Sequence, residues 1–249
     1  MAGHSHWANI AHKKAAIDSK RGKLWSKLSK AIIVAAKMGG GDPDHNVRLR
    51  KAVEDAKAVS LPKINIDRAI KKGTGELEGG NVEEILYEGY GPGGVAILCE
   101  IMTDNRNRTA PEIRTIFGKY NGNLGSTGCV SYLFDRKGLF VFAEGTDEEV
   151  VTEIALENGA DDVSVNDDGK LEVTCTPDCF AKLAEAFKTR NLVCEVNEVT
   201  QIPQTEVEVD PDTARSALKL LEMLDDHDDV QSVSTNLKIT AEVMAEMEG

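Results

Sequence analysis

Long hydrophobic runs are absent from this chain of 249 residues. The longest apolar stretch, AIIVAAKM at positions 31–38, is far shorter than the about 18 residues that a membrane-spanning helix requires. The N-terminus also lacks the apolar segment and the small-residue cleavage site of a secretory signal. We therefore expect neither a transmembrane helix nor secretion, and we predict that the protein is cytoplasmic.

Cysteine is scarce and irregularly spaced. The chain has five cysteines, an odd number, and no two of them have C-x-x-C spacing. The nearest pair, Cys175 and Cys179, has no histidine nearby that could complete a zinc site. The pattern argues against a disulfide framework and predicts reduced, mostly buried thiols. The five are Cys99, Cys129, Cys175, Cys179 and Cys194.

Catalytic motifs are absent as well. The chain has no HExxH, GxSxG or GxxxxGKS/T motif. Gly89, Gly91 and Gly94 match G-x-G-x-x-G, but a strand pattern follows them, whereas a dinucleotide site requires a helix there. The acidic run at 225–229 is interpreted as a solvated turn at a helix end. We predict no catalytic residue, no metal site and no cofactor; an enzyme with an unrecognised site is the alternative.

Charge is divided unevenly along the chain. Residues 1–72 hold 16 Lys and Arg against 6 Asp and Glu, and the remaining 177 hold 13 against 36. The net charges are therefore +10 and −23, within a total of −13. A basic segment joined to an acidic remainder suggests nucleic-acid binding by the basic part. We predict nucleic acid as the partner, with no membrane and no small-molecule substrate; the oligomeric state stays open.

A basic helix is predicted from Gly22 to Met38. Its apolar residues recur at three- and four-residue steps, and its lysines fall within an arc of about 80° on the opposite side. A row of ammonium groups suits phosphates, because each neutralised phosphate releases counterions. The alternative is an ordinary solvated face. The apolar set is Leu24, Trp25, Leu28, Ala31, Ile32 and Ala35, and the lysine row is Lys23, Lys27, Lys30 and Lys37.

Further candidates precede this helix. Trp7 lies among His12, Lys13 and Lys14, and such a mixture suits nucleic acid because rings stack on bases while cations hold phosphates. The complete set of predicted nucleic-acid-binding residues is Trp7, His12, Lys13, Lys14, Lys20, Arg21, Lys23, Lys27, Lys30 and Lys37.

A second basic group lies in the acidic part of the chain. A helix is predicted to begin at about Ala110, where Thr109 and Glu112 form a capping box. Arginines before and after this point would converge on the helix N-terminus, which predicts a secondary anion site. The arginines are Arg106, Arg108 and Arg114. The alternative is local pairing with Asp104, Glu100 or Glu112.

The order of predicted elements divides the chain into three parts. Residues 1–75 are predicted as a basic helical bundle that ends in a glycine-rich linker at 73–81. Residues 135–200 have the βαββαβ order of a ferredoxin-like domain. This domain is inserted between 76–134, which includes a strand at 129–134, and 201–240. The predicted fold class is α+β multidomain, a helical bundle followed by two α/β domains, of which the ferredoxin-like one interrupts the other.

Three long segments resemble the YebC family, which is described as a family of transcriptional regulators and is related to the mitochondrial translational activator of cytochrome oxidase. The resemblance covers nearly the whole chain and implies a helical N-terminal domain and two α/β domains. The segments are MAGHSHWANIAHKKAAIDSKRGKLWSKL, MGGGDPDHNVRLRKAVEDAKAVSLPKINIDRAIKKG and YEGYGPGGVAILCEIMTDNRNRTAPEIRTIF.

The resemblance implies a nucleic-acid-binding, non-enzymatic regulator of gene expression, most simply a DNA-binding transcriptional regulator. The alternative is a ribosome- or RNA-binding translation factor that eases the synthesis of proline-rich stretches. The basic helix offers mainly lysine, which contacts phosphate and carries little sequence information. A helix that reads DNA usually presents Asn, Gln or Arg to the bases. The residues themselves therefore favour binding by shape, to DNA or RNA.

Overall fold

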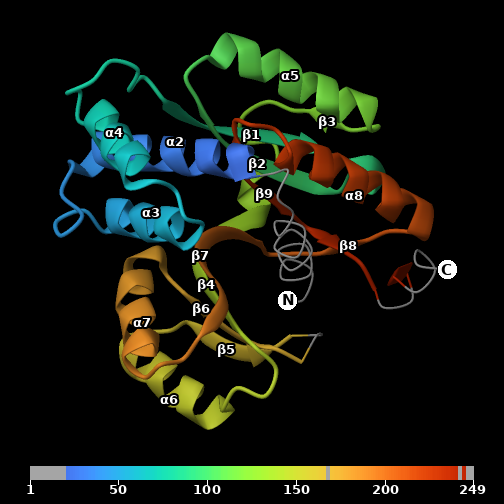
Figure 1. The fold of residues 1–249 in the computed structure, drawn as a ribbon. Helices are drawn as coiled ribbons and strands as arrows, with labels where there is room; N and C mark the ends of the chain where they lie inside the picture. Colours follow the sequence, from blue (N-terminus) through green and yellow to red (C-terminus); the bar gives the residue numbers. More distant parts are fainter. Residues whose placement is uncertain (1–20, 167–168, 241–242, 245–249) are drawn as a thin grey trace.

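The computed structural model describes residues 21–166, 169–240 and 243–244. Over these residues the protein has seven α-helices, two four-stranded antiparallel sheets and one two-stranded parallel ladder (Figure 1). The α+β class predicted from the sequence is confirmed.

The helical bundle consists of α2 (Arg21–Gly39), α3 (Val47–Ala58) and α4 (Lys63–Gly73). Asn46 begins α3: its side-chain oxygen accepts from the Leu49 amide at 3.0 Å, and its side-chain nitrogen donates to the Ala35 carbonyl at 2.8 Å. This residue therefore satisfies an orphan donor at the start of α3 and fastens α3 to α2.

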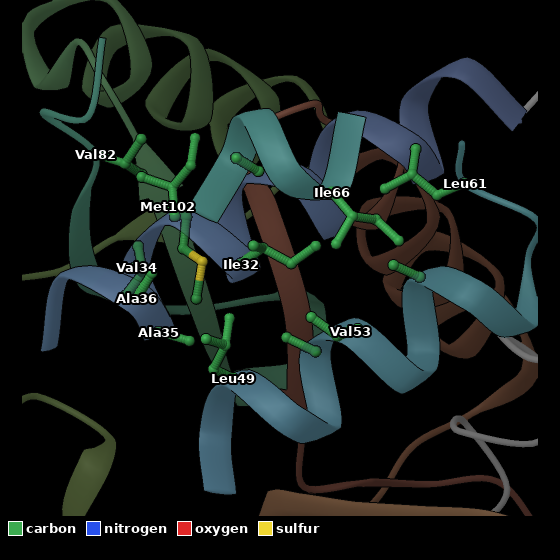
Figure 2. Packing of buried hydrophobic residues seen from close by; sticks show 14 residues of the cluster. Ile32, Val34, Ala35, Ala36, Leu49, Val53, Leu61, Ile66, Val82 and Met102 are labelled. Atoms are coloured by element: carbon green, nitrogen blue, oxygen red, sulfur yellow. The ribbon is translucent and has the colours of Figure 1, made fainter. Parts of the chain in front are cut away.

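The centre of the bundle is α2. Residues 32–36 of this helix are buried at five consecutive positions, so every side of this segment is covered. The expectation that only one apolar stripe of α2 is buried is therefore wrong for this segment. Figure 2 shows the core that surrounds it, to which Val82 and Met102 contribute from outside the bundle.

The first sheet has the strand order β3-β1-β2-β9. Strand β2 carries Ile101 toward the core under α5 and α8, and the adjacent Met102 toward the bundle core, because successive strand residues point to opposite faces. Both faces of the sheet are thus covered, by elements far apart in sequence. The elements are β1 (Glu83–Tyr90), β2 (Ala96–Thr103), β3 (Asn123–Leu124), β9 (Val230–Thr235), α5 (Arg106–Lys119) and α8 (Pro211–Asp225).

The second sheet has the order β5-β6-β4-β7 and carries α6 and α7 on one face. Aromatic rings fill that interface: Phe140 stacks on Phe180 with centroids 4.9 Å apart, and Phe187 meets Phe142 edge-on at 5.0 Å. The elements are β4 (Phe134–Phe142), α6 (Glu148–Asn158), β5 (Asp162–Val165), β6 (Leu171–Cys175), α7 (Pro177–Thr189) and β7 (Cys194–Pro203). The parallel ladder joins β8 (Val207–Glu208) to β10 (Leu237–Lys238).

The strand predicted at 129–134 is wrong. A short 3-10 turn, η3 (Ser131–Leu133), stands there, and β4 begins only at Phe134. The buried carboxylate of Glu88 accepts hydrogen bonds from the amides of Gly128, Val130 and Ser131 at 2.7–2.9 Å. Amides that point at one carboxylate cannot form a regular strand ladder, which explains the turn.

Candidate nucleic-acid interface

Half of the predicted nucleic-acid-binding residues cannot be placed. Trp7, His12, Lys13, Lys14 and Lys20 lie outside the described residues. Arg21 is the first residue of α2, and its side chain is not described either. The structure therefore places only the lysine row, which is Lys23, Lys27, Lys30 and Lys37.

Three members of the lysine row, Lys23, Lys27 and Lys30, lie against the aspartate loop (residues 225–229) at the C-terminal end of α8, whereas Lys37 donates to the Val82 carbonyl at 3.4 Å. The Lys23 ammonium donates to the Asp226 carboxylate at 2.9 Å, and Lys27 donates to the Asp225 carbonyl at 2.6 Å. The carbonyls at the end of a helix have no partner within it and carry partial negative charge, so cations are favoured there. The Lys27 side chain is only 15% exposed. Burial lowers its pKa, and the Asp225 carboxylate opposes that shift.

Lys30 reaches the most buried member of this loop. It donates to the carboxylate of Asp229, which is only 3% exposed. The same carboxylate accepts from Thr109 at 2.6 Å and from both Arg108 and Thr103 at 3.1 Å. Burial alone would raise the pKa of Asp229, but the hydrogen bonds from Lys30, Thr109 and Arg108 hold it well below its usual range. The prediction of a solvated turn is therefore wrong for Asp229.

Sequence reasoning missed Asp229 because it stands in a run of similar acids. The neighbouring Asp228 is exposed, as the run suggests. Asp229, however, immediately precedes β9, and its carbonyl accepts from the Met102 amide at 2.8 Å as the chain enters the first sheet. The signal available in the sequence was its position directly before Val230, the first residue of the segment that forms β9.

The helix that carries the predicted secondary anion site begins earlier than expected. Asn105 is the N-cap of α5 and accepts from the Arg108 amide at 3.1 Å, so the first helical residue is Arg106. The capping box predicted at Thr109 and Glu112 is wrong, because Thr109 lies inside the helix and its hydroxyl donates to the buried carboxylate described above.

The three predicted arginines do not converge. Arg108 forms ion pairs with Asp104 and Asp229 at 3.1 Å, the first of which is the alternative that the sequence offered. Arg106 and Arg114 are exposed, and neither pairs with another described residue. Eight residues separate these two, which is about 12 Å along a helix axis. A role for Arg106 and Arg114 in anion binding stays a prediction.

A second group of cations occupies the corner between α3 and α4, defined here as residues 57–72. This corner has five Lys and Arg and one acid, Asp67. Among the described residues none of the five has an ion-pair partner, and all but Lys72 are exposed. Counting charge over this segment would have identified it from the sequence. The five are Lys57, Lys63, Arg68, Lys71 and Lys72.

Within the described ranges, no group of three or more His, Cys, Asp and Glu side chains is arranged to hold a metal ion. None of the described helices combines the length and apolarity needed to cross a membrane. All five cysteines are free, with Cys99 and Cys175 buried.

These features define an α+β protein in which a basic helical bundle is joined to an acidic α/β body. Residues 5–76 match the model described as the TACO1/YebC protein N-terminal domain, and residues 82–237 match that of the TACO1/YebC second and third domain. The chain belongs to the TACO1/YebC family, as its resemblance had indicated.

Relatives match over their full length. A protein of Rhodopirellula baltica is 66% identical over 99% of this chain and 100% of its own, and one of Geobacter sulfurreducens is 54% identical over the same shares. Both are named probable transcriptional regulatory proteins. The crystal structure of a conserved hypothetical protein of Aquifex aeolicus is similar with a TM-score of 0.86 at 46% identity, covering 96% of this chain and 99% of that one.

Proposed function

We propose that this protein is a nucleic-acid-binding, non-enzymatic regulator of gene expression that binds DNA. The observation that carries the proposal is the charge division, +10 over residues 1–72 against −23 over the rest. A bundle with unpaired cations beside an acidic body is suited to bind a polyanion. The cations neutralise phosphates, and the negative charge of the body repels phosphates that approach elsewhere on the surface. The names of the relatives support transcription as the process.

The alternative is a translation factor that binds ribosomal RNA and eases the synthesis of proline-rich stretches. The composition of the exposed corner between α3 and α4 favours contact with phosphate in either nucleic acid. Four of its five cations are lysine, which holds phosphate without reading bases. Shape-level binding of this kind suits a structured RNA as well as a DNA duplex.

Crosslinking in cells, followed by sequencing of the attached nucleic acid, tests the proposal. Enrichment of promoter DNA is expected, and enrichment of ribosomal RNA would instead support the translation factor. Recovery of neither above the level of an unrelated acidic protein would contradict both. Because the partner would be nucleic acid and the cysteines are free, we propose the cytoplasm as the site of action.

Most of the lysine row can bind phosphate only after a change of conformation. In the conformation described here, carboxylates and helix-end carbonyls occupy the positions that phosphates would take beside Lys23, Lys27 and Lys30. Phosphate binding by these three lysines therefore requires the aspartate loop to move away. Lys37 is exposed and donates to the Val82 carbonyl oxygen at 3.4 Å rather than to the aspartate loop, so its availability does not depend on that loop.

We further infer the three-part organisation predicted from the sequence, with domains at 1–75, at 76–134 with 201–240, and at 135–200. Two observations support it. The order β5-β6-β4-β7, with helices on one face, is that of a ferredoxin-like domain. Strand β9, from beyond that segment, pairs with β2 from before it. Limited proteolysis should release a fragment spanning about 135–200; cleavage elsewhere would contradict these boundaries.

A further inference from the structure

The exposed side of α4 forms one continuous face. At about 100° per residue, its five exposed positions between 63 and 71 fall within an arc of about 140°. The opposite side is buried against α2 through Ile66 and Ala69. Figure 1 shows α4 at the periphery of the molecule, with α3 between it and α7. The five exposed residues are Lys63, Ile64, Asp67, Arg68 and Lys71.

Positive charge on this face is not cancelled by ion pairs. Asp67 lies between Lys63 and Lys71 on the helix surface, yet it forms no ion pair with any described residue. Two further acids, Glu76 and Glu78, follow the helix, and residues 57–78 still hold five cations against three acids. These ammonium and guanidinium groups remain available to a partner, unlike those of Lys23, Lys27 and Lys30.

The dimensions of this face suit a duplex. Lys63 and Lys71 are separated by about 12 Å along the helix axis, and duplex DNA carries one charge per about 1.7 Å, so several phosphates lie within reach. An α-helix of about 10–12 Å diameter also matches the DNA major groove, about 12 Å wide, whereas the major groove of duplex RNA is narrow and deep. Ile64, 67% exposed among these cations, adds an apolar contact for sugars or thymine methyl groups.

We propose that the exposed face of α4, together with Lys57, is the surface on which this protein binds duplex DNA through its phosphates. The inference rests on the proposed function and deepens it, because it assigns binding to α4 rather than to the lysine row of α2. Lysine contacts position the duplex without reading its bases, so binding is largely independent of sequence.

Fluorescence anisotropy with a labelled DNA duplex of about 30 base pairs tests this inference in the full chain. The triple variant Lys63→Gln, Arg68→Gln, Lys71→Gln should weaken the affinity at least about tenfold at low salt. The slope of log K against log salt should fall by about 3, one unit for each lost phosphate contact. Its thermal midpoint should stay unchanged, because these side chains have no partners to lose.

A matched control removes the same charge from another exposed helix. The triple variant Lys182→Gln, Lys188→Gln, Arg190→Gln, on α7 and its C-cap, should leave the affinity within about twofold when both triple variants are compared at moderate salt, where net charge acts weakly at a distance. Asp67→Asn should tighten binding, because it removes the one acid on the proposed face. Equal losses from both triple variants, or no effect of Asp67→Asn, would overturn the assignment to α4.

Other results of the same binding experiment distinguish a failure of the α4 assignment from a failure of the proposed function. A wild-type protein that binds no duplex even at low salt would overturn the proposed function. Salt-dependent binding that the α4 triple variant retains would overturn only the assignment of the surface. A duplex RNA of the same sequence serves as competitor, and a clear preference for that RNA would overturn duplex DNA as the occupant.

Discussion

Asp229 is a buried carboxylate that four donors from three elements satisfy. Lys30 comes from α2, Arg108 and Thr109 from α5, and Thr103 from the end of β2. A buried charge is tolerated only when it is paired and hydrogen-bonded, and here both conditions are met. Removing the carboxylate would leave the half-buried Lys30 ammonium without its counter-charge.

Asp229→Asn is therefore expected to lower the free energy of unfolding by about 3 kcal/mol. Urea denaturation followed by circular dichroism measures this change. The matched control is Asp228→Asn, one residue earlier and exposed, which should change stability by no more than about 0.5 kcal/mol. Similar small effects of the two variants would contradict a stabilising role for the Asp229 carboxylate.

The pH dependence of stability in the wild type and in Asp229→Asn tests whether the Asp229 carboxylate stabilises the fold through its charge. The pKa of Asp229 is lowered in the folded protein, so its stabilisation is complete above the unfolded pKa of about 3.9 and is lost as pH falls through the folded value. The stability difference between wild type and Asp229→Asn should be constant from about pH 8 to about pH 5 and shrink below about pH 4. A difference that persisted undiminished in acid would indicate that the carboxylate acts without its charge.

At the scale of elements, the contact between α2 and α4 depends on a glycine, Gly73, which has no side chain. A Cβ at Gly73 would lie 2.5 Å from the Ile33 carbonyl oxygen and 2.7 Å from the Ala36 Cβ, both closer than atoms can approach. The glycine thus permits α4 to pack directly on the backbone of α2. This close contact holds the exposed face of α4 in place.

Gly73→Ala should destabilise the protein by about 2 kcal/mol, because α4 must move away from α2 and the gain in helix propensity is smaller than that cost. Gly118→Ala provides the opposite case within α5. No atom lies within 4 Å of the new Cβ there, so only the propensity gain of about 0.5–1 kcal/mol remains. Thermal unfolding should show that Gly73→Ala is less stable than the wild type and Gly118→Ala more stable. Stabilisation by both substitutions would refute the close contact between α2 and α4.

At the scale of the molecule, the bundle is tied to the first sheet by more than its linker. Val82 and Met102 belong to the bundle core, Arg48 pairs with Glu84 on β1, and three members of the lysine row donate to the aspartate loop. The glycine-rich segment at 73–81, which by itself suggested a flexible linker, lies beside these contacts. Bundle and first sheet should therefore open together.

Native-state hydrogen exchange measures this coupling. Amides of α3 and of β9 should show similar opening free energies, and Asp229→Asn should reduce protection in both by a similar factor. Amides of α7, in the second sheet unit, should lose less protection than these. Bundle amides that exchange much faster than those of β9 in the wild type would show that the bundle opens on its own at the linker.

Local sequence patterns determined most of the elements. Helix α2, predicted from Gly22 to Met38 on the spacing of its apolar residues, is found at Arg21–Gly39. The charge division and the family were likewise present in the chain itself. One local error arose at Ser131, where a distant carboxylate, that of Glu88, accepts from the amide, and another at Thr109, because the nearby Asn105 caps α5 instead.

Tertiary structure alone decided which cations are available. On the sequence, Lys27 and Lys63 are equivalent lysines of basic helices. The fold covers Lys27 with the end of α8 and leaves Lys63 exposed, because α2 is the central helix of the bundle and α4 is an outer one. It also distinguishes Asp229 from the adjacent Asp228. The periodicity of a sequence shows which residues share one face of a helix. Whether that face is buried depends on residues elsewhere, which for Lys27 lie nearly 200 positions away along the chain.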